Sequence, residues 1–218
     1  MAMATDKARP SVRNASVKAA FILVANLVVA AALIGPMAML SGADPFHPGG
    51  ASSGWAAFVG LLHVTFGATA LAMRASARFL DDAEEAEDLR REGRALLLGA
   101  GALIAAGSSL ILLALAGPES RLTPSQTLAG VLSLTALAWV LVWVRWRLLD
   151  ELNRAVTTDA GYLTVTWLSL VGGTWAIAAH LGLAPTPAPL DWLTMISGFS
   201  FIAGLAALAR RGGFDTVR

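Results

Sequence analysis

Two polar side chains that could carry a proton or hold a solute lie inside long apolar runs. His63 lies near the middle of one run, roughly 16 Å from Arg74 at about 1.5 Å per residue. Asn26 lies about 12 Å in from Lys18 in the preceding run by the same rule. Polar groups at such depth normally face other helices, where they find partners. We therefore expect Asn26 and His63 to point into the bundle, within reach of each other or of a Ser or Thr on another span. Such contacts would either join helices or form part of a path for a proton or solute.

The most polar segment, residues 78–94, mixes acids with arginines. Carboxylate oxygens are the ligands that Ca²⁺ and Mg²⁺ favour, but the spacing of these acids matches no EF-hand loop. Glu87 and Arg91 form an i,i+4 pair of the favourable polarity, which supports a helix. We interpret the segment first as a solvated helix that extends the preceding apolar run. A docking surface and a hard-cation site are the alternatives.

The three histidines do not converge in the sequence pattern. His63 and His180 differ in estimated depth by roughly 10 Å, and His47 lies in a loop, so a shared metal or haem is awkward. His180 shares a helical face with Gly172 and Ala176, which predicts that it points into a close helix contact. No Asp, Glu, Lys or Arg lies deep inside an apolar run, whereas ion-coupled carriers and proton pumps usually have one. The chain has no cysteine, and we expect no enzymatic activity, cofactor or metal.

Six long apolar runs must position these residues. The chain is 56% hydrophobic and 14% charged, against about 25% charged in a soluble domain, so a bilayer is its natural solvent. A spanning helix needs about 20 mainly apolar residues. The sequence predicts an all-α bundle of six transmembrane helices within residues 17–211, flanked by a disordered tail at 1–16 and a second tail at 212–218. The predicted spans are roughly 17–40, 55–73, 95–116, 127–144, 161–183 and 193–209.

The basic residues predict the direction of the spans. Fifteen of the sixteen Lys and Arg residues lie in the two tails, in alternate loops or within two residues of the adjoining span ends, and Arg121 alone lies in the other three loops. The positive-inside rule then places both termini in the cytoplasm, in a bacterial inner membrane. A net charge of +1 argues against nucleic acid as a partner. The expected partners are the lipid bilayer and a cytoplasmic or membrane protein. Small residues form faces on the predicted spans, such as Gly101, Ala105 and Ser109 on the third and Ala129 and Ser133 on the fourth. These faces serve either packing within one monomer or a homo-oligomer.

Two cytoplasmic helix ends share a motif. The second run ends at residues 78–82 in Arg-Phe-Leu-Asp-Asp, and the fourth ends at 147–151 in Arg-Leu-Leu-Asp-Glu. Their offset of 69 residues also superimposes the third run on the fifth. Two explanations stay open: an internal repeat of a two-span unit, or the ordinary gathering of charge at cytoplasmic helix ends. We predict that the charged side chains of the two ends pair across the bundle: Arg78, Asp81, Asp82, Arg147, Asp150 and Glu151.

The second copy of this motif resembles a cytoplasmic loop of small, uncharacterised bacterial inner-membrane proteins. Those proteins have the loop Asp-Glu-Leu/Met-Gln-Arg-(Arg)-Ile-Gln-x-Glu-Ala between two spans, and a closing Arg-Arg pair. The resemblance covers residues 145–211 and implies a fold and a location, but no activity and no catalytic residues. Departures are Asn153, Val156 and Thr157, and Asp159 replaces the usual Glu. The matching residues are Asp150, Glu151, Leu152, Arg154 and Ala160, with Arg210 and Arg211 as the closing pair.

These observations favour a non-enzymatic membrane protein that acts by interaction. It would present the acidic helix 79–92 and the loop 147–160 to a partner. The alternative is a small transporter or channel for an uncharged or weakly polar solute, with a polar path near Asn26 and His63. An enzyme acting on lipids is the third hypothesis, and it lacks paired acids or a Ser/Lys pair at depth. The candidate interaction or polar-path residues are Asn26, His63, Arg78, Asp81, Asp82, Arg147, Asp150, Glu151 and Arg154.

Overall fold

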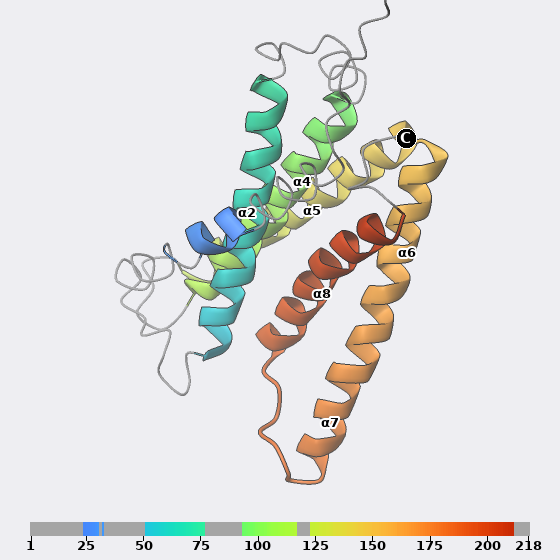
Figure 1. The fold of residues 1–218 in the computed structure, drawn as a ribbon. Helices are drawn as coiled ribbons and strands as arrows, with labels where there is room; N and C mark the ends of the chain where they lie inside the picture. The colour runs from blue at the N-terminus through green and yellow to red at the C-terminus, as the bar shows by residue number, and fades with distance from the viewer. Residues whose placement is uncertain (1–23, 31, 33–50, 77–92, 117–122, 212–218) are drawn as a thin grey trace, which may run out of the picture.

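The computed structural model describes residues 24–30, 32, 51–76, 93–116 and 123–211, and within these ranges all regular structure is helical (Figure 1). Residues 24–30 form a short helical stretch within the first predicted span. The predicted all-α class is confirmed for this part of the chain. The other elements are α2 (Ala51–Ser76), α4 (Gly93–Ala114), α5 (Pro124–Leu148), α6 (Glu151–Trp167), the π-helical turn η2 (Leu168–Gly172), α7 (Gly173–His180) and α8 (Pro189–Arg210).

Five helical segments of the described chain are long and apolar enough to cross a membrane. They are α2, α4, α5, the continuous segment Glu151–His180 and α8. This is the architecture of a multi-pass membrane protein. Most of the first predicted span, residues 17–40, lies outside the described residues, as do the two predicted tails.

Successive long helices run in opposite directions (Figure 1). α2, α5 and α8 therefore end where α4 and α6 begin, and we call this the arginine-rich end. The other end of the bundle, which we call the opposite end, includes the loop 181–188. The arginine-rich end carries Arg74, Arg94, Arg145, Arg147, Arg154, Arg210 and Arg211.

α2 and α4 pack with their backbones in contact at glycines. A Cβ built at Gly60 would lie 2.7 Å from the carbonyl oxygen of Gly107, and one built at Gly67 would lie 2.7 Å from that of Ala100. Such approach excludes any side chain at these points. This is the close crossing that small residues permit between membrane helices.

The small-residue face predicted for the third span packs against α5. Ser109 Oγ lies 3.2 Å from Thr135 Oγ1, and a Cβ built at Gly101 would lie 3.2 Å from Leu141 Cδ1. The corresponding face predicted for the fourth span differs, because Ala129 and Ser133 are exposed on α5. α5 instead faces α4 with Gly130, where a Cβ would lie 2.7 Å from Leu112 Cδ2, and with Thr135 and Leu141.

Residues 151–160, predicted as part of a loop, form the first turns of a helix. Asp150 caps its N-terminus, where its carboxylate oxygen accepts a hydrogen bond of 2.7 Å from Asn153 N–H. The hydroxyls of Thr157 and Thr158 donate to carbonyl oxygens four residues earlier, so these polar residues fit within a helix. The helical segment has 30 residues, about 45 Å at about 1.5 Å per residue, and exceeds a hydrocarbon core of about 30 Å.

Two tryptophans mediate the contact between the segment Glu151–His180 and α8. Gly172 faces Trp192, whose ring carbon Cζ3 would lie 2.8 Å from a Cβ at Gly172. Trp167 meets Phe199 edge-on at a centroid distance of 6.3 Å. Beyond η2, α7 diverges from α8 (Figure 1), and His180 is exposed. The prediction that His180 points into a close helix contact is therefore wrong, because among the described residues no other helix packs closely on the end of α7.

The packing of α2 with α4 is not repeated by α5 with α6. α2 packs extensively on α4, whereas α5 packs on α4 and α6 packs on α8. α5 and α6 diverge from the corner at residues 149–150 (Figure 1). The internal repeat thus finds no support in how the helices pair.

Candidate functional site

Asn26 and His63 both lie in the interior of the bundle, with 5% and 6% of their surfaces exposed. The Oδ1 atom of Asn26 accepts a hydrogen bond of 3.2 Å from Thr69 Oγ1 on α2. Thr69 lies six residues after His63. Asn26 is thus bonded to a threonine of another helix, which is the kind of contact that holds membrane helices together.

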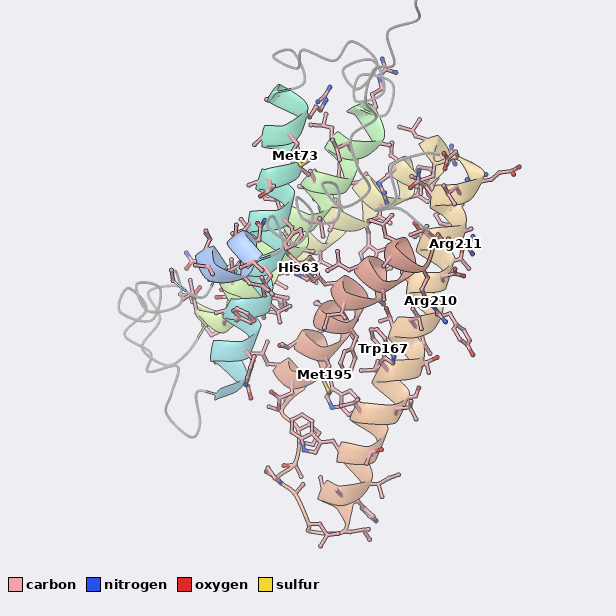
Figure 2. All side chains as sticks on the ribbon, in the orientation of Figure 1. His63, Met73, Trp167, Met195, Arg210 and Arg211 are labelled. Atoms are coloured by element: carbon pink, nitrogen blue, oxygen red, sulfur yellow. The ribbon has the colours of Figure 1, made fainter. Side chains whose placement is uncertain are left out.

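His63 is enclosed by three helices. Its Nδ1 lies 2.8 Å from the carbonyl oxygen of Val59, one turn earlier in α2, and therefore donates to it. Its ring centroid is 5.3 Å from that of Phe201 on α8, and its Cβ would lie 2.8 Å from a Cβ at Gly107 on α4. Figure 2 shows His63 between α2 and α8, away from Arg210 and Arg211. On these two sides His63 thus lies against Gly107 and the ring of Phe201.

Arg147, predicted to pair with an acid, lies over an aromatic ring. Its Cζ is 4.0 Å from the centroid of the Trp143 ring, one turn earlier in α5. Asp150 is occupied as the N-cap of α6, and Glu151 is exposed in the first turn of that helix, where the helix dipole favours an acid. Within the described residues, Arg147 therefore has no acidic partner. Arg78, Asp81 and Asp82 lie outside the described residues, as does the rest of the acidic segment.

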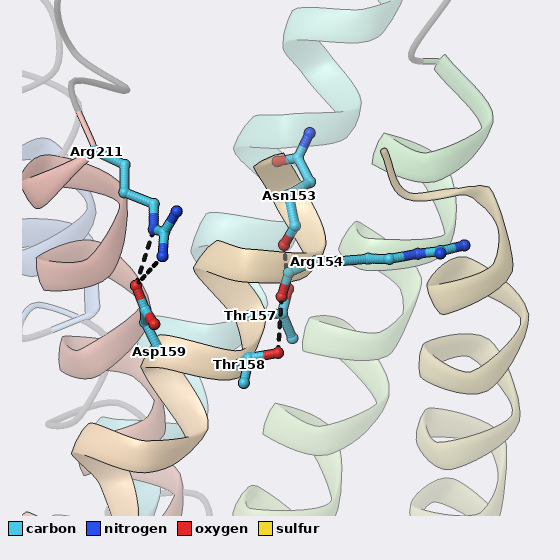
Figure 3. A network of polar contacts seen from close by, with 6 residues as sticks. All are labelled: Asn153, Arg154, Thr157, Thr158, Asp159 and Arg211. Atoms are coloured by element: carbon cyan, nitrogen blue, oxygen red, sulfur yellow. Dashed lines mark hydrogen bonds and ion pairs between the residues drawn. The ribbon is translucent and has the colours of Figure 1, made fainter. Parts of the chain in front are cut away.

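An ion pair that the sequence did not predict joins α6 to the end of α8. Arg211 donates from Nε and Nη2 to the same oxygen of Asp159, at 2.8 Å and 2.7 Å (Figure 3). Both residues are partly exposed, at 36% and 45% of their side-chain surfaces. Asp159 lies in the loop part of the motif that resembles the bacterial proteins, and Arg211 belongs to its closing Arg-Arg pair. Interpreting residues 147–160 as a loop concealed their pairing, because only a helix directs Asp159 toward α8.

Arg154 and Arg145 take different positions at this end. Arg154 is exposed, and Figure 3 shows its side chain extending from α6 away from Arg211. Arg145 turns toward α4 and is only partly exposed, and its Nε is buried with no hydrogen-bond partner. The predicted fourth span ends at residue 144, so Arg145 is expected from the sequence to be a loop cation.

No group of three metal-ligating side chains comes together in the described ranges. His47 and the acids of residues 81–88 lie outside those ranges, so the hard-cation alternative for the acidic segment stays a prediction. The exposed side chains at the arginine-rich end are suited to electrostatic contacts.

No known protein-family model, curated protein or solved structure matches this chain.

Proposed function

We propose that this chain is a six-span protein of the bacterial inner membrane with both termini in the cytoplasm. We further propose that it is not an enzyme and acts by binding a protein partner at its arginine-rich end. The orientation is supported by the collection of arginines at one end of the helices, which the positive-inside rule assigns to the cytoplasm. The partner is either cytoplasmic or another membrane protein.

One observation carries the interaction proposal: the corner between α5 and α6 presents an exposed apolar side chain among exposed charges. Leu152 is 55% exposed, and charged residues of both signs surround it in the sequence. An apolar centre with a polar rim is the usual anatomy of a protein interface. The exposed charged residues of this corner are Arg147, Asp150, Glu151 and Arg154.

Cross-linking in living cells tests this proposal. A photoreactive amino acid replaces Leu152 in one variant and Leu183, which is 79% exposed at the opposite end, in a matched control. We expect a discrete protein adduct from position 152 that disappears when Glu151→Lys and Arg154→Glu are added. Adducts with lipid alone at position 152, or the same adduct from position 183, would contradict the proposal.

The transport alternative depends on a polar path near Asn26 and His63. The contacts of His63 with Val59, Phe201 and α4 favour a role in holding helices together instead. Transport therefore ranks second among the functions proposed for this chain.

A further inference from the structure

Arg145 lies on the face of α5 that packs against α4. This face repeats at intervals of three and four residues, as expected for one side of a helix. Trp139 and Trp143, on other faces of α5, are 71% and 59% exposed. The only charged residue of the buried face thus points into the bundle rather than outward. The face comprises Thr127, Val131, Leu134, Ala138, Leu141 and Arg145, none of which is exposed.

Gly99 provides the space in which the Arg145 side chain lies on α4. A Cβ built at Gly99 would lie 3.0 Å from Nε, 3.3 Å from Cδ and 3.6 Å from Cζ of Arg145. The Arg145 side chain therefore lies close to the backbone of α4 at Gly99. A Cβ at position 99 would force it to shift by a few tenths of an ångström.

The charge of Arg145 has no acidic partner within the described chain. Its Nε is buried without a hydrogen bond. Asp150 caps α6, and Asp159 is paired with Arg211. Leaving a partly buried charge unpaired in an apolar setting is costly, so an external anion would gain more here than at an exposed arginine.

The depth of Arg145 matches that of lipid headgroups. It lies in the last turn of α5, between Trp143 and Trp146, which are both exposed. Exposed tryptophans mark the interface between hydrocarbon and headgroups. Leu137, Val144 and Leu148, on an adjacent face of the same helix, are exposed and suited to acyl chains.

We propose that the guanidinium of Arg145, lying on α4 at Gly99, binds the phosphate of an anionic phospholipid in the leaflet at the arginine-rich end. The guanidinium supplies charge-assisted hydrogen bonds to the phosphate oxygens. Apolar side chains of α5 take the acyl chains. This site does not depend on the protein partner proposed above.

Lipid binding to the purified full chain in a neutral detergent tests the proposal. Phosphatidylglycerol and phosphatidylcholine are added separately, and bound lipid is counted by native mass spectrometry. The variant Arg145→Gln is compared with Arg147→Gln, which makes the same charge change on the other side of α5. We expect Arg145→Gln to weaken phosphatidylglycerol binding about tenfold, as for loss of a hydrogen bond to a charged group, and Arg147→Gln to change it little.

A second readout separates binding from folding. Without added lipid, Arg145→Gln should melt at or above the wild-type temperature, because it removes an unpaired charge. Gly99→Ala keeps the arginine but shifts its side chain by a few tenths of an ångström, and should weaken phosphatidylglycerol binding by less than Arg145→Gln does. Gly204→Ala is the matched control, because a Cβ there meets no atom within 4 Å.

Three outcomes would overturn the proposal. Equal losses in Arg145→Gln and Arg147→Gln would indicate a nonspecific charge effect. Inorganic phosphate is also added in place of lipid in the melting experiment. If it raises the melting temperature as much as phosphatidylglycerol does, the ligand is a free anion. A lower melting temperature of Arg145→Gln without lipid, with lipid binding unchanged, would give Arg145 a partner within the chain, such as the acids of residues 81–88.

Discussion

Buried polar side chains in this protein are bonded close to where they lie. His63 donates to its own helix, and Asn26 accepts from Thr69. Bonds of this kind stabilise membrane helices modestly, because the separated helices also find partners. The contacts of His63 with Phe201 and α4 thus favour a role in helix packing over a role in proton or solute transfer.

Replacing His63 with leucine tests which of the two roles it has. If His63 holds helices together, His63→Leu should change the free energy of unfolding in detergent by only about 0.5–1.5 kcal/mol. Flux of glycerol or urea into liposomes should be the same for the variant and the wild type. A flux that is present in the wild type and lost in His63→Leu would restore the polar-path hypothesis.

The ion pair of Arg211 with Asp159 should contribute little stability but measurable coupling. Both side chains are partly exposed, so a double-mutant cycle of Arg211→Gln and Asp159→Asn should give about 0.2–1 kcal/mol. The coupling should fall at high salt. Additive effects of the two changes would mean that the pair does not form in solution.

At the scale of elements, glycines determine which helices can cross closely. α2 and α4 approach so closely at Gly60 and Gly107 that one backbone fills the space of the other's missing side chain. The hydrophobic runs alone did not reveal these contacts. Glycine is common in membrane helices, and nothing in the sequence separates a crossing glycine from Gly204, which meets no atom.

Gly107→Ala should therefore destabilise the protein, whereas Gly204→Ala should not. The added Cβ of Gly107→Ala meets the backbone at Gly60 and the side chain of His63, which cannot move without shifting a helix. Overpacking of this kind typically costs about 1–3 kcal/mol. Thermal unfolding in detergent compares the two variants. Equal melting temperatures would show that α2 and α4 are not in contact as described.

The start of α6 illustrates the limit of predicting helix ends from apolarity. Residues 151–160 include many polar residues, so the hydropathy pattern predicts that the fifth span begins only after them, at residue 161. The Asp150 cap and the back-bonded hydroxyls of Thr157 and Thr158 nevertheless continue the helix.

At the scale of the whole molecule, the sequence predicted the apolar spans that a bilayer requires. It did not predict which helices pack against each other, because side-chain packing decides that. The lengths of the apolar runs correctly predicted the five long apolar helices of the described chain. A segment in lipid must form its backbone hydrogen bonds internally, so such a run becomes a helix. The pairing of α5 with α4, and of α6 with α8, depends on shape at single residues such as Gly99 and Gly172. The burial of Arg145 follows from that pairing, so the sequence could not predict it as a site.

The six-span topology is the central claim, and cysteine labelling tests it most directly. The chain has no cysteine, so single cysteines can be placed without removing any. An impermeant thiol reagent applied to intact spheroplasts should label cysteines at Gly42, Pro118 and Thr186. Cysteines at Glu85, Asn153 and Asp215 should be labelled only after lysis. Labelling of Asn153 in intact spheroplasts, or protection of Thr186, would contradict the orientation. Protection of Gly42 would contradict the first predicted span, residues 17–40.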